Sequence, residues 1–439
     1  MTVVGDEIEL ELTGIAHGGT AVGRAADGRV VFVADAIPGE RVVARVAEVK
    51  KSFARADALR VLESSPHRVP HVWREADLDR DPADRAGGAE FGHIALPHQR
   101  ELKARVLREA LLRFSGADRR DGAESAPETR AAPAPGSTDL KAGVVVEAVA
   151  GDDAAGGLGW RSRVRLQVDG AGRLGPFAAR SHRVIPVDAL PLADPRIQAS
   201  GLLAERFPGE ESVAAIAPSP DPAAGRVGEG IRLIIGRQQP TVIVERVAFA
   251  DGLREFQVDD TGFWQVHREA PAVLAAETRA AIDLDRFDPA ADNLDLYGGV
   301  GLLAAAMLEL GGASTRVTSV ESAGRATGHA ATNLVEFPGA SAVTARVDRW
   351  LAAAVREGRD LAGATIVLDP PRSGAGGEVT RALLGLGAAQ LVYVACDPVA
   401  LARDAATLEA GGYRLSRLRA FDLFPHTHHV EAVATFIPA

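Results

Sequence analysis

The stretch NLDLYGGVG at residues 293–301 decides the fold of the carboxy-terminal part of the chain. An apolar strand pattern runs up to Tyr297, a glycine turn follows, and LLAAAM at 302–307 continues as a helix. Strand, glycine turn and helix form one unit of an open α/β sheet, in which glycines let the backbone approach a bound cofactor. Strands keep alternating with Ala-rich helices up to residue 439, which predicts a doubly wound parallel sheet.

A second strand, VTSVE at 317–321, ends in Glu321. It lies roughly 20 residues beyond the glycine turn, the separation at which a carboxylate commonly meets a ribose hydroxyl. The glycine spacing differs from the dinucleotide fingerprint, and acid-ending strands around such a turn favour S-adenosylmethionine. The structural alternative is an ordinary βαβ turn followed by a solvated glutamate.

Composition excludes several classes of protein. The 439 residues are too many for one hydrophobic core, and 46% hydrophobic with 25% charged residues is typical of a globular protein. A single cysteine excludes an internal disulfide, a thiolate metal site and an iron–sulfur cluster, and it fits the reducing cytoplasm. We expect no signal peptide, because acidic residues interrupt the first segment, and no membrane span, because no uncharged apolar run is long enough.

Changes of pattern along the chain predict three domains. Residues 1–63 carry short alternating strands joined by tight turns, which indicates a small β-barrel. Residues 64–258 predict a central domain of mixed β structure, with an amphipathic helix at 96–112 that we expect to pack on the domain at 259–439. Two segments rich in Ala, Gly and Pro are predicted to be flexible surface loops, at 116–138 and 208–228.

The charge distribution leaves a nucleic-acid partner open. A formal net charge of -10 argues against phosphate binding, which depends on Lys and Arg. Two segments reverse the sign locally: residues 41–60 hold six basic against two acidic residues, and residues 160–183 hold six against one. Such segments are compatible with a localised nucleic-acid surface, or with a merely solvated face of alternating arginines.

Three strand-like runs deliver reactive side chains. LVYVA leads into Cys396, IVL leads into Asp369, and Glu431 opens the run AVATF. Strand ends are where open α/β sheets place their chemistry, although a lone cysteine is as often a buried packing residue. A carboxylate at the edge of a buried strand is costly without a role, which makes Glu431 a candidate base. Three histidines within 426–429 lack a second ligand cluster, so we expect no metal site.

Together the motifs carry a family resemblance. GFWQV (262–266), DLYGGVG (295–301), DPPR (369–372), YVACDP (393–398) and FPHT with HVE (424–431) resemble, in this order, the class I RNA 5-methyluridine methyltransferases. The amino-terminal motifs resemble the TRAM domain, an OB-like RNA-binding module: GIAHGG (14–19), AVGR (21–24), VADAIPGE (33–40) and VKKSF (49–53). The resemblance spans essentially the whole chain.

The resemblance implies a reaction and a set of residues. It implies methyl transfer from S-adenosylmethionine to carbon 5 of a uridine in tRNA or ribosomal RNA, a uridine that leaves its stack to reach the thiol. Cys396 would be the nucleophile, Glu431 the general base and Arg372 a cation that supports the thiolate. The positions that match the cofactor site are Gln265, Tyr297, Glu321 and Asp369, with Asp348 a weaker match. The alternative is an RNA-binding member of the same fold with altered or lost activity.

The chain also departs from the family pattern. Many relatives hold an iron–sulfur cluster through four cysteines, including a Cys-Gly-Gly-Cys. Here AGGA stands at 86–89 and Leu190 stands where another cluster cysteine is expected, so we expect no cluster. Gly298 and Ala395 replace a cysteine and a serine near the site, and neither position is needed for the chemistry. No long exposed apolar stripe is evident, so a monomer is expected.

Overall fold

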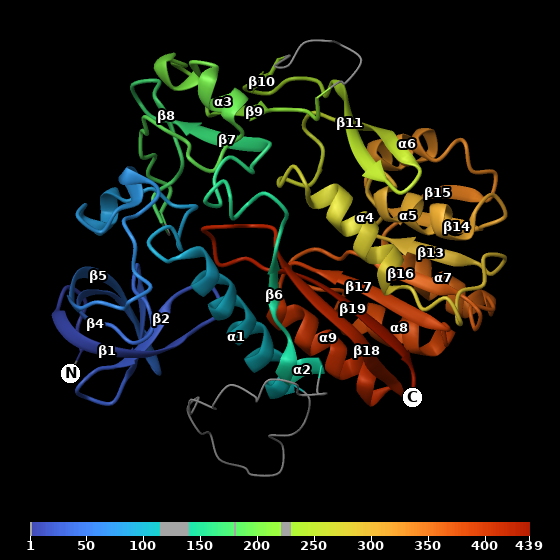
Figure 1. The fold of residues 1–439 in the computed structure, drawn as a ribbon, viewed down its shortest axis with the longest axis horizontal. Helices are drawn as coiled ribbons and strands as arrows, with labels where there is room; N and C mark the ends of the chain where they lie inside the picture. Colours follow the sequence, from blue (N-terminus) through green and yellow to red (C-terminus); the bar gives the residue numbers. More distant parts are fainter. Residues whose placement is uncertain (1, 115–139, 180, 221–229) are drawn as a thin grey trace.

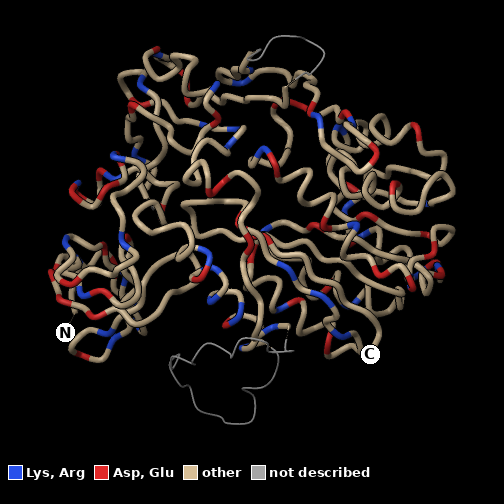
Figure 2. Tube along the Cα trace, in the orientation of Figure 1, with Lys and Arg blue, Asp and Glu red and all other residues tan. Residues whose placement is uncertain are grey.

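The computed structural model describes residues 2–114, 140–179, 181–220 and 230–439. Over these ranges the chain forms an amino-terminal barrel, a central β region and a large carboxy-terminal sheet, with helix α1 (Leu96–Phe114) between the barrel and that sheet (Figure 1). Charged residues of both signs are interspersed over all three parts (Figure 2). The predicted loop at 116–138 lies outside the described residues.

The barrel is closed by five strands in the order β1-β2-β3-β5-β4. Alternate apolar side chains, among them Leu10, Val31 and Ala56, are buried inside it, as the period-two pattern predicts. Closure removes the unpaired strand edges of a small sheet. The strands are β1 (Glu7–Ile15), β2 (Ala21–Arg24), β3 (Val30–Ala34), β4 (Arg41–Val49) and β5 (Phe53–Glu63), and the short helices η1 (Arg74–Ala76) and η2 (Pro82–Asp84) follow.

Helix α1 ends at Phe114, two residues beyond the end of the helix expected at 96–112. Its buried side chains Ala104, Leu107 and Leu111 belong to the same hydrophobic cluster as α9 (Pro398–Ala410) of the carboxy-terminal part. The short helix α2 (Leu140–Gly143) also packs on α1. The chain between barrel and sheet is therefore anchored in the carboxy-terminal core.

The central region is a four-stranded antiparallel sheet in the order β10-β9-β7-β8. One prediction is wrong in part here: Ser212–Ile216, inside the loop predicted at 208–228, forms strand β9 at the centre of this sheet. The small residues of this segment resemble those of a flexible loop in composition, but in the structure they are buried in a strand that lies between β10 and β7. The other elements are β7 (Arg163–Val168), β8 (Leu174–Gly175), α3 (Pro195–Ala199), η3 (Leu202–Ala204) and β10 (Arg232–Ile235).

The predicted α/β class is confirmed in the carboxy-terminal part, whose eight strands run in the order β15-β14-β13-β16-β17-β19-β18-β6. The sheet is not wholly parallel, because β19 is antiparallel to both β17 and β18. A short connection at 423–430 joins β18 to β19, and so tight a connection allows only antiparallel pairing. The strands are β6 (Val146–Ala148), β13 (Asn293–Leu296), β14 (Val317–Glu321), β15 (Ala340–Thr344), β16 (Thr365–Leu368), β17 (Gln390–Ala395), β18 (Tyr413–Asp422) and β19 (Glu431–Pro438).

Helices cover both faces of this sheet (Figure 1). Along β17 the side chains alternate: Leu391 and Tyr393 pack with α7, α8 and α9, whereas Val392 and Val394 pack with α4 and α5. Burial on both faces explains the continuous apolar run of this strand. The helices are α4 (Ala270–Ala281), α5 (Leu302–Gly311), α6 (Gly324–Asn333), α7 (Val347–Glu357) and α8 (Gly376–Leu386).

The domain boundaries at residues 63 and 258 stay predictions. Two elements inside 64–258 pack with the carboxy-terminal part: β6 pairs with β18, and the hairpin of β11 (Val242–Phe249) and β12 (Gly252–Asp259) shares a hydrophobic cluster with α4 and α5. No helix in the described ranges is long and apolar enough to cross a membrane.

Candidate active site

The predicted site residues line one edge of the carboxy-terminal sheet. The carboxyl ends of its parallel strands meet there, and antiparallel β19 brings its first residue to the same edge, where Ala432 pairs with Ala395. Following the strand order across the sheet, the edge carries Asp348 (after β15), Glu321 (β14), Tyr297 (β13), Asp369 (β16), Cys396 (β17) and Glu431 (β19).

The glycine turn after β13 faces open space. Tyr297, Gly299 and Gly301 have φ angles of 63°, 55° and 91°, a left-handed conformation that is costly for tyrosine. A side chain at Gly299 would meet nothing within 4 Å, whereas one at Gly298 would collide with Ser319 Oγ and the Asp295 carboxylate. The turn is therefore packed against Ser319 and Asp295 at Gly298 and open at Gly299, where a ligand would lie.

Glu321 is held beside this turn by three hydrogen bonds. Its carboxylate accepts from the Gly299 amide (3.2 Å), the Ala323 amide (2.7 Å) and the Ser322 hydroxyl (3.0 Å). A carboxylate oriented by such donors keeps further lone pairs for a ligand's hydroxyl groups. An open glycine turn, an oriented carboxylate and an aromatic ring fit S-adenosylmethionine.

Asp348 faces the same turn from the start of α7. Its carboxylate pairs with Arg346 (Nη2 to Oδ2, 2.7 Å), and this hydrogen bond lowers the pKa of Asp348 to about 2. Burial, and then the charges of Asp348 and Asp404, raise the pKa of Tyr297 to about 12. Gln265 lies in the segment between β12 and α4, half-buried after Phe263, whose side chain is 75% exposed.

Cys396 opens into a cavity of about 150 Å³ between the barrel and the sheet edge. Burial first, and then the charges of Glu431 and Asp369, raise the pKa of the Cys396 thiol to about 12. Arg372 lines the same cavity, and its positive charge lowers the pKa of the thiol, but burial and the two carboxylates outweigh it. The free protein therefore holds Cys396 as a thiol at neutral pH.

Buried carboxyls surround the thiol. Burial, and then the charge of Asp295, raise the pKa of Asp369 to about 7. Burial, and then the charge of Asp369, raise the pKa of Glu431 well above its ordinary value. Neighbouring carboxyls in a dry site cannot all ionise, so Asp369 and Glu431 compete to hold a proton, and the one that ionises can act as a base.

Sequence reasoning did not assign a role to Asp295. It is fully buried, and its Oδ2 accepts from the Ala304 amide (3.2 Å) and the Ser319 hydroxyl (3.2 Å). Burial raises the pKa of Asp295 to about 7. The signal was present, because a carboxylate between Leu294 and Leu296 in an apolar strand needs a partner or a role.

The barrel contributes directly to the cavity, which the sequence also did not reveal. His17 Nε2 lies 2.9 Å from Asp397 Oδ2, and Asp397 caps α9 through the Val399 and Ala400 amides. The loop residues Ala16 to Gly19 line the cavity opposite Cys396. Residues so far apart in the chain carry no local pattern that would reveal their contact.

The histidines of 426–429 have structural partners. His426 Nδ1 lies 3.0 Å from Gln99 Nε2, and His426 Nε2 lies 2.8 Å from the Gly156 carbonyl. Across the described ranges no group of three or more His, Cys, Asp or Glu side chains is arranged to hold a metal ion. His428 and His429 line the cavity beside Cys396.

Comparison with known proteins identifies the families and relatives that this chain resembles. The TRAM domain family matches residues 2–59, and the family described as tRNA (Uracil-5-)-methyltransferase matches residues 354–437. An uncharacterized RNA methyltransferase of Streptomyces avermitilis is 37% identical over 99% of both chains, and one of Streptomyces coelicolor is 36% identical over 100% of this chain and 94% of the relative.

One solved structure shares the whole fold. Pyrococcus abyssi tRNA (uracil-54, C5)-methyltransferase in complex with S-adenosyl-L-homocysteine superposes with a TM-score of 0.64 at 20% identity, covering 98% of this chain and 100% of the other. With both domain families in place and full-length relatives above 30% identity, the chain belongs to the TRAM-containing, S-adenosylmethionine-dependent RNA methyltransferases of the tRNA (uracil-5-)-methyltransferase family.

Proposed function

We propose that this protein methylates carbon 5 of a uridine in tRNA or ribosomal RNA through a covalent adduct between Cys396 and the uracil ring. The observation that carries the proposal is the antiparallel pairing of β17 with β19, which brings Glu431 to the strand end that bears Cys396. A nucleophile and a base at neighbouring strand ends suit an addition followed by an elimination.

Each residue type answers a chemical need. Carbon 5 of uracil is a poor nucleophile, and addition of the Cys396 thiolate to carbon 6 places the ring's negative charge on carbon 5. Gln265, Tyr297, Glu321, Asp369 and, as a weaker match, Asp348 would hold S-adenosylmethionine, which when bound would supply the electrophilic methyl group that carbon 5 takes up. Glu431 then takes the proton from carbon 5, the carbon 6–sulfur bond breaks, and the thiolate leaves. Asp369 would lie between S-adenosylmethionine and the uracil ring.

Formation of the thiolate is the first requirement of this scheme. The thiol of the free protein has a pKa of about 12, first because it is buried and then because Glu431 and Asp369 lie near it. Arg372 lines the same cavity and lowers the pKa of the thiol, and a neighbouring carboxyl that holds a proton does not repel the thiolate. The proton of the thiol passes to solvent before the thiolate adds to the ring.

RNA would reach the thiol through the cavity beneath the barrel loop. The uridine must leave its stack, because the barrel, α1 and the sheet edge enclose Cys396. The basic segments at 41–60 and 160–183 would bind the phosphate backbone. We place the enzyme in the cytoplasm, as a monomer that uses no metal and no iron–sulfur cluster.

RNA containing 5-fluorouridine tests the mechanism. Its carbon 5 carries fluorine in place of the proton that Glu431 removes, so the methylated adduct cannot be resolved. The expected result is a stable protein–RNA adduct with the wild type and S-adenosylmethionine, and none with Cys396→Ala. Absence of the adduct with the wild type would favour the alternative of an RNA-binding protein without this activity. Mass mapping of 5-methyluridine in tRNA and ribosomal RNA from a deletion strain identifies the target.

A further inference from the structure

The loop between β18 and β19, residues 423–430, forms one wall of the thiol cavity and leads directly into Glu431. Its conformation is not an intrinsically favourable one. His426 has a φ of 64°, in the left-handed region that costs a non-glycine residue free energy unless the surroundings fix it. The loop therefore depends on its contacts. Two side chains of α1 supply three of the polar ones, and Phe91, Gly156 and Glu90 supply others.

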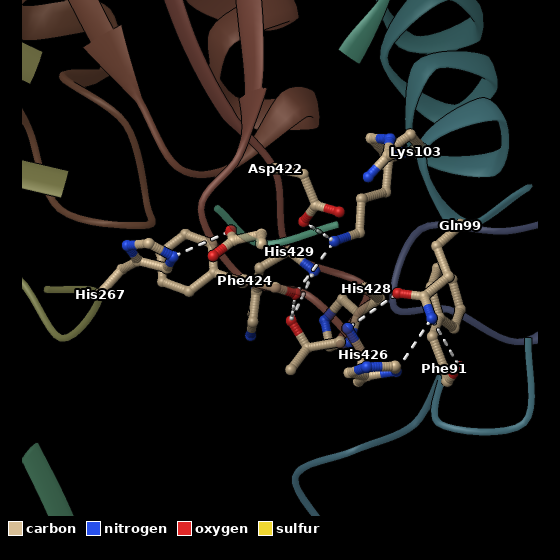
Figure 3. A network of polar contacts seen from close by, with 12 residues as sticks. Phe91, Gln99, Lys103, His267, Asp422, Phe424, His426, His428 and His429 are labelled. Atoms are coloured by element: carbon tan, nitrogen blue, oxygen red, sulfur yellow. Dashed lines mark hydrogen bonds and ion pairs between the residues drawn. The ribbon is translucent and has the colours of Figure 1, made fainter. Parts of the chain in front are cut away.

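Lys103 is the first of these contacts. Its ammonium group lies 2.5 Å from Asp422 Oδ1 and donates to the Phe424 carbonyl at 3.0 Å. The Lys103 side chain is 0% exposed and that of Asp422 1% exposed. Asp422 is the last residue of β18 and follows Phe421, which pairs with Glu431. The buried amine thus fixes both the strand end beside the base and the first turn of the loop (Figure 3).

Gln99 is the second contact, one helical turn before Lys103 on the same face of α1. Its Oε1 accepts from the His426 amide at 2.8 Å, and its Nε2 lies 3.0 Å from His426 Nδ1. The His426 Nε2–H donates to the Gly156 carbonyl, so Nδ1 is the acceptor for Gln99. Backbone and ring of the left-handed residue are both held by one amide (Figure 3).

We infer that Gln99 and Lys103 are positioning residues for the base Glu431: they hold the 423–430 loop so that the base reaches the proton on carbon 5 and the cavity keeps its wall. The inference rests on the proposed function for the role of Glu431. Lys103 also lines the cavity at Cys396, but within the described residues no hydrogen bond or ion pair joins Gln99 or Lys103 to Cys396 or Glu431. We therefore assign their effect to the loop. Buried polar contacts of this kind favour one conformation over others.

Hydrogen exchange on the free protein tests the positioning without any reaction. Gln99→Leu and Lys103→Met should each speed amide exchange in residues 423–430 and leave β17, Gln390–Ala395, as protected as in the wild type. Glu101→Gln is the matched control, because Glu101 lies on the same helix with a side chain 68% exposed and should change neither segment. Unchanged exchange at 423–430 in both variants would overturn the inference.

Turnover tests the consequence. In both variants kcat should fall roughly 10- to 100-fold, since a displacement of about 1 Å can have that effect. The KM for S-adenosylmethionine should stay within about twofold, because the cofactor half of the edge does not contact α1. Elimination should slow more than addition, so a covalent adduct should accumulate on ordinary uridine RNA. Wild-type kcat per folded molecule in both variants would overturn the inference.

A double variant separates positioning from folding. Lys103→Met leaves Asp422 buried and unpaired, whereas Lys103→Met with Asp422→Leu removes both charges and should recover most of the lost thermal stability. The kcat should stay low in the double variant, because the Phe424 carbonyl still lacks its donor. Recovery of kcat together with stability would contradict the inference. If the wild type makes no 5-methyluridine, the proposed function fails, and the exchange result still decides whether α1 holds the loop.

Discussion

The sheet edge has two halves that contain the same kinds of residue in different surroundings. We call the strand ends that carry Asp348, Glu321 and Tyr297 the cofactor half, and those that carry Asp369, Cys396 and Glu431 the nucleophile half. In the cofactor half, Glu321 receives three hydrogen bonds and Asp348 pairs with an arginine, which lowers its pKa to about 2. In the nucleophile half, Asp369 and Glu431 are buried beside other carboxyls, and burial raises the pKa of both. Carboxyl groups only a few strands apart thus differ in the direction of their pKa shifts: the pKa of Asp348 is lowered, and those of Asp369 and Glu431 are raised.

The difference shows how one scaffold separates binding from chemistry. Backbone donors and exposed arginines stabilise a fixed negative charge, which is what a ligand's hydroxyl groups need. Removal of water and partners leaves a carboxyl poised to gain or lose a proton near neutral pH, which is what a base needs. The identity of the residue decides neither role; its surroundings do.

The largest expected effect comes from breaking the nucleophile half. Cys396→Ala should lower RNA methylation at least about 1,000-fold, because no other nucleophile lies at the strand end. Its affinity for S-adenosylmethionine should stay within about twofold of wild type, since the cofactor half is untouched. Methyl incorporation and calorimetric titration measure the two quantities. Full methylation by the variant would refute the covalent mechanism.

A substitution in the cofactor half should weaken the binding of S-adenosylmethionine and have little effect on turnover. Glu321→Gln replaces an ionised acceptor by an amide and should weaken S-adenosylmethionine binding roughly 10- to 100-fold, the range for a hydrogen bond to a charged group. Turnover at saturating cofactor should change far less. Titration calorimetry checks the affinity, and Glu357→Gln, a carboxyl that is 57% exposed at the end of α7, is the control. An unchanged affinity would remove Glu321 from the cofactor site.

The raised pKa values make stability depend on pH. Asp295 has a folded pKa of about 7 against an ordinary value of 3.8, so between these values the folded state binds more protons than the unfolded state. Stability should therefore fall as pH rises from about 4 to 7, by up to about 1.4 kcal/mol per pH unit for this group. Asp295→Asn should flatten the decline, with Asp369 sustaining the remainder. Thermal unfolding at several pH values measures how the free energy of unfolding depends on pH. The same dependence in Asp295→Asn and in the wild type would show that burial does not raise the pKa of Asp295.

The smallest expected effect is on the rate at which the Cys396 thiol reacts with an alkylating reagent. Glu431→Gln removes a negative charge beside Cys396, which should stabilise the thiolate and lower its pKa. Alkylation of the free protein by iodoacetamide at pH 9 should be several times faster than in the wild type. The gain should shrink as the pH is lowered, because protonation of Glu431 in the wild type removes the same charge. Slower alkylation at pH 9 would show that the carboxyl assists rather than represses the thiolate.

Local patterns predicted the sheet edge but not what surrounds it. Cys396, Asp369 and Glu321 each follow an apolar run, and the fold brings such strand ends together without further information. The contacts of His17 with Asp397 and of Lys103 with Asp422 join distant segments, and no periodicity encodes them. Strand β9 was mistaken for a loop because alanine has little strand preference and only its two neighbours bury it.

The pairing of α1 with the loop before Glu431 sets an order for synthesis. Gln99 and His426 are 327 residues apart, so α1 is made long before its partner exists. α1 can pack on α9 as soon as α9 is made, but until β18 arrives the Lys103 amine lacks the Asp422 carboxylate. Contacts of such long range form late and slowly. A growing or broken chain that ends before β19 carries the barrel, the glycine turn and Cys396 but not Glu431. Under the proposed mechanism such a chain would form the adduct with RNA without the base that resolves it, and only the completed chain would turn over.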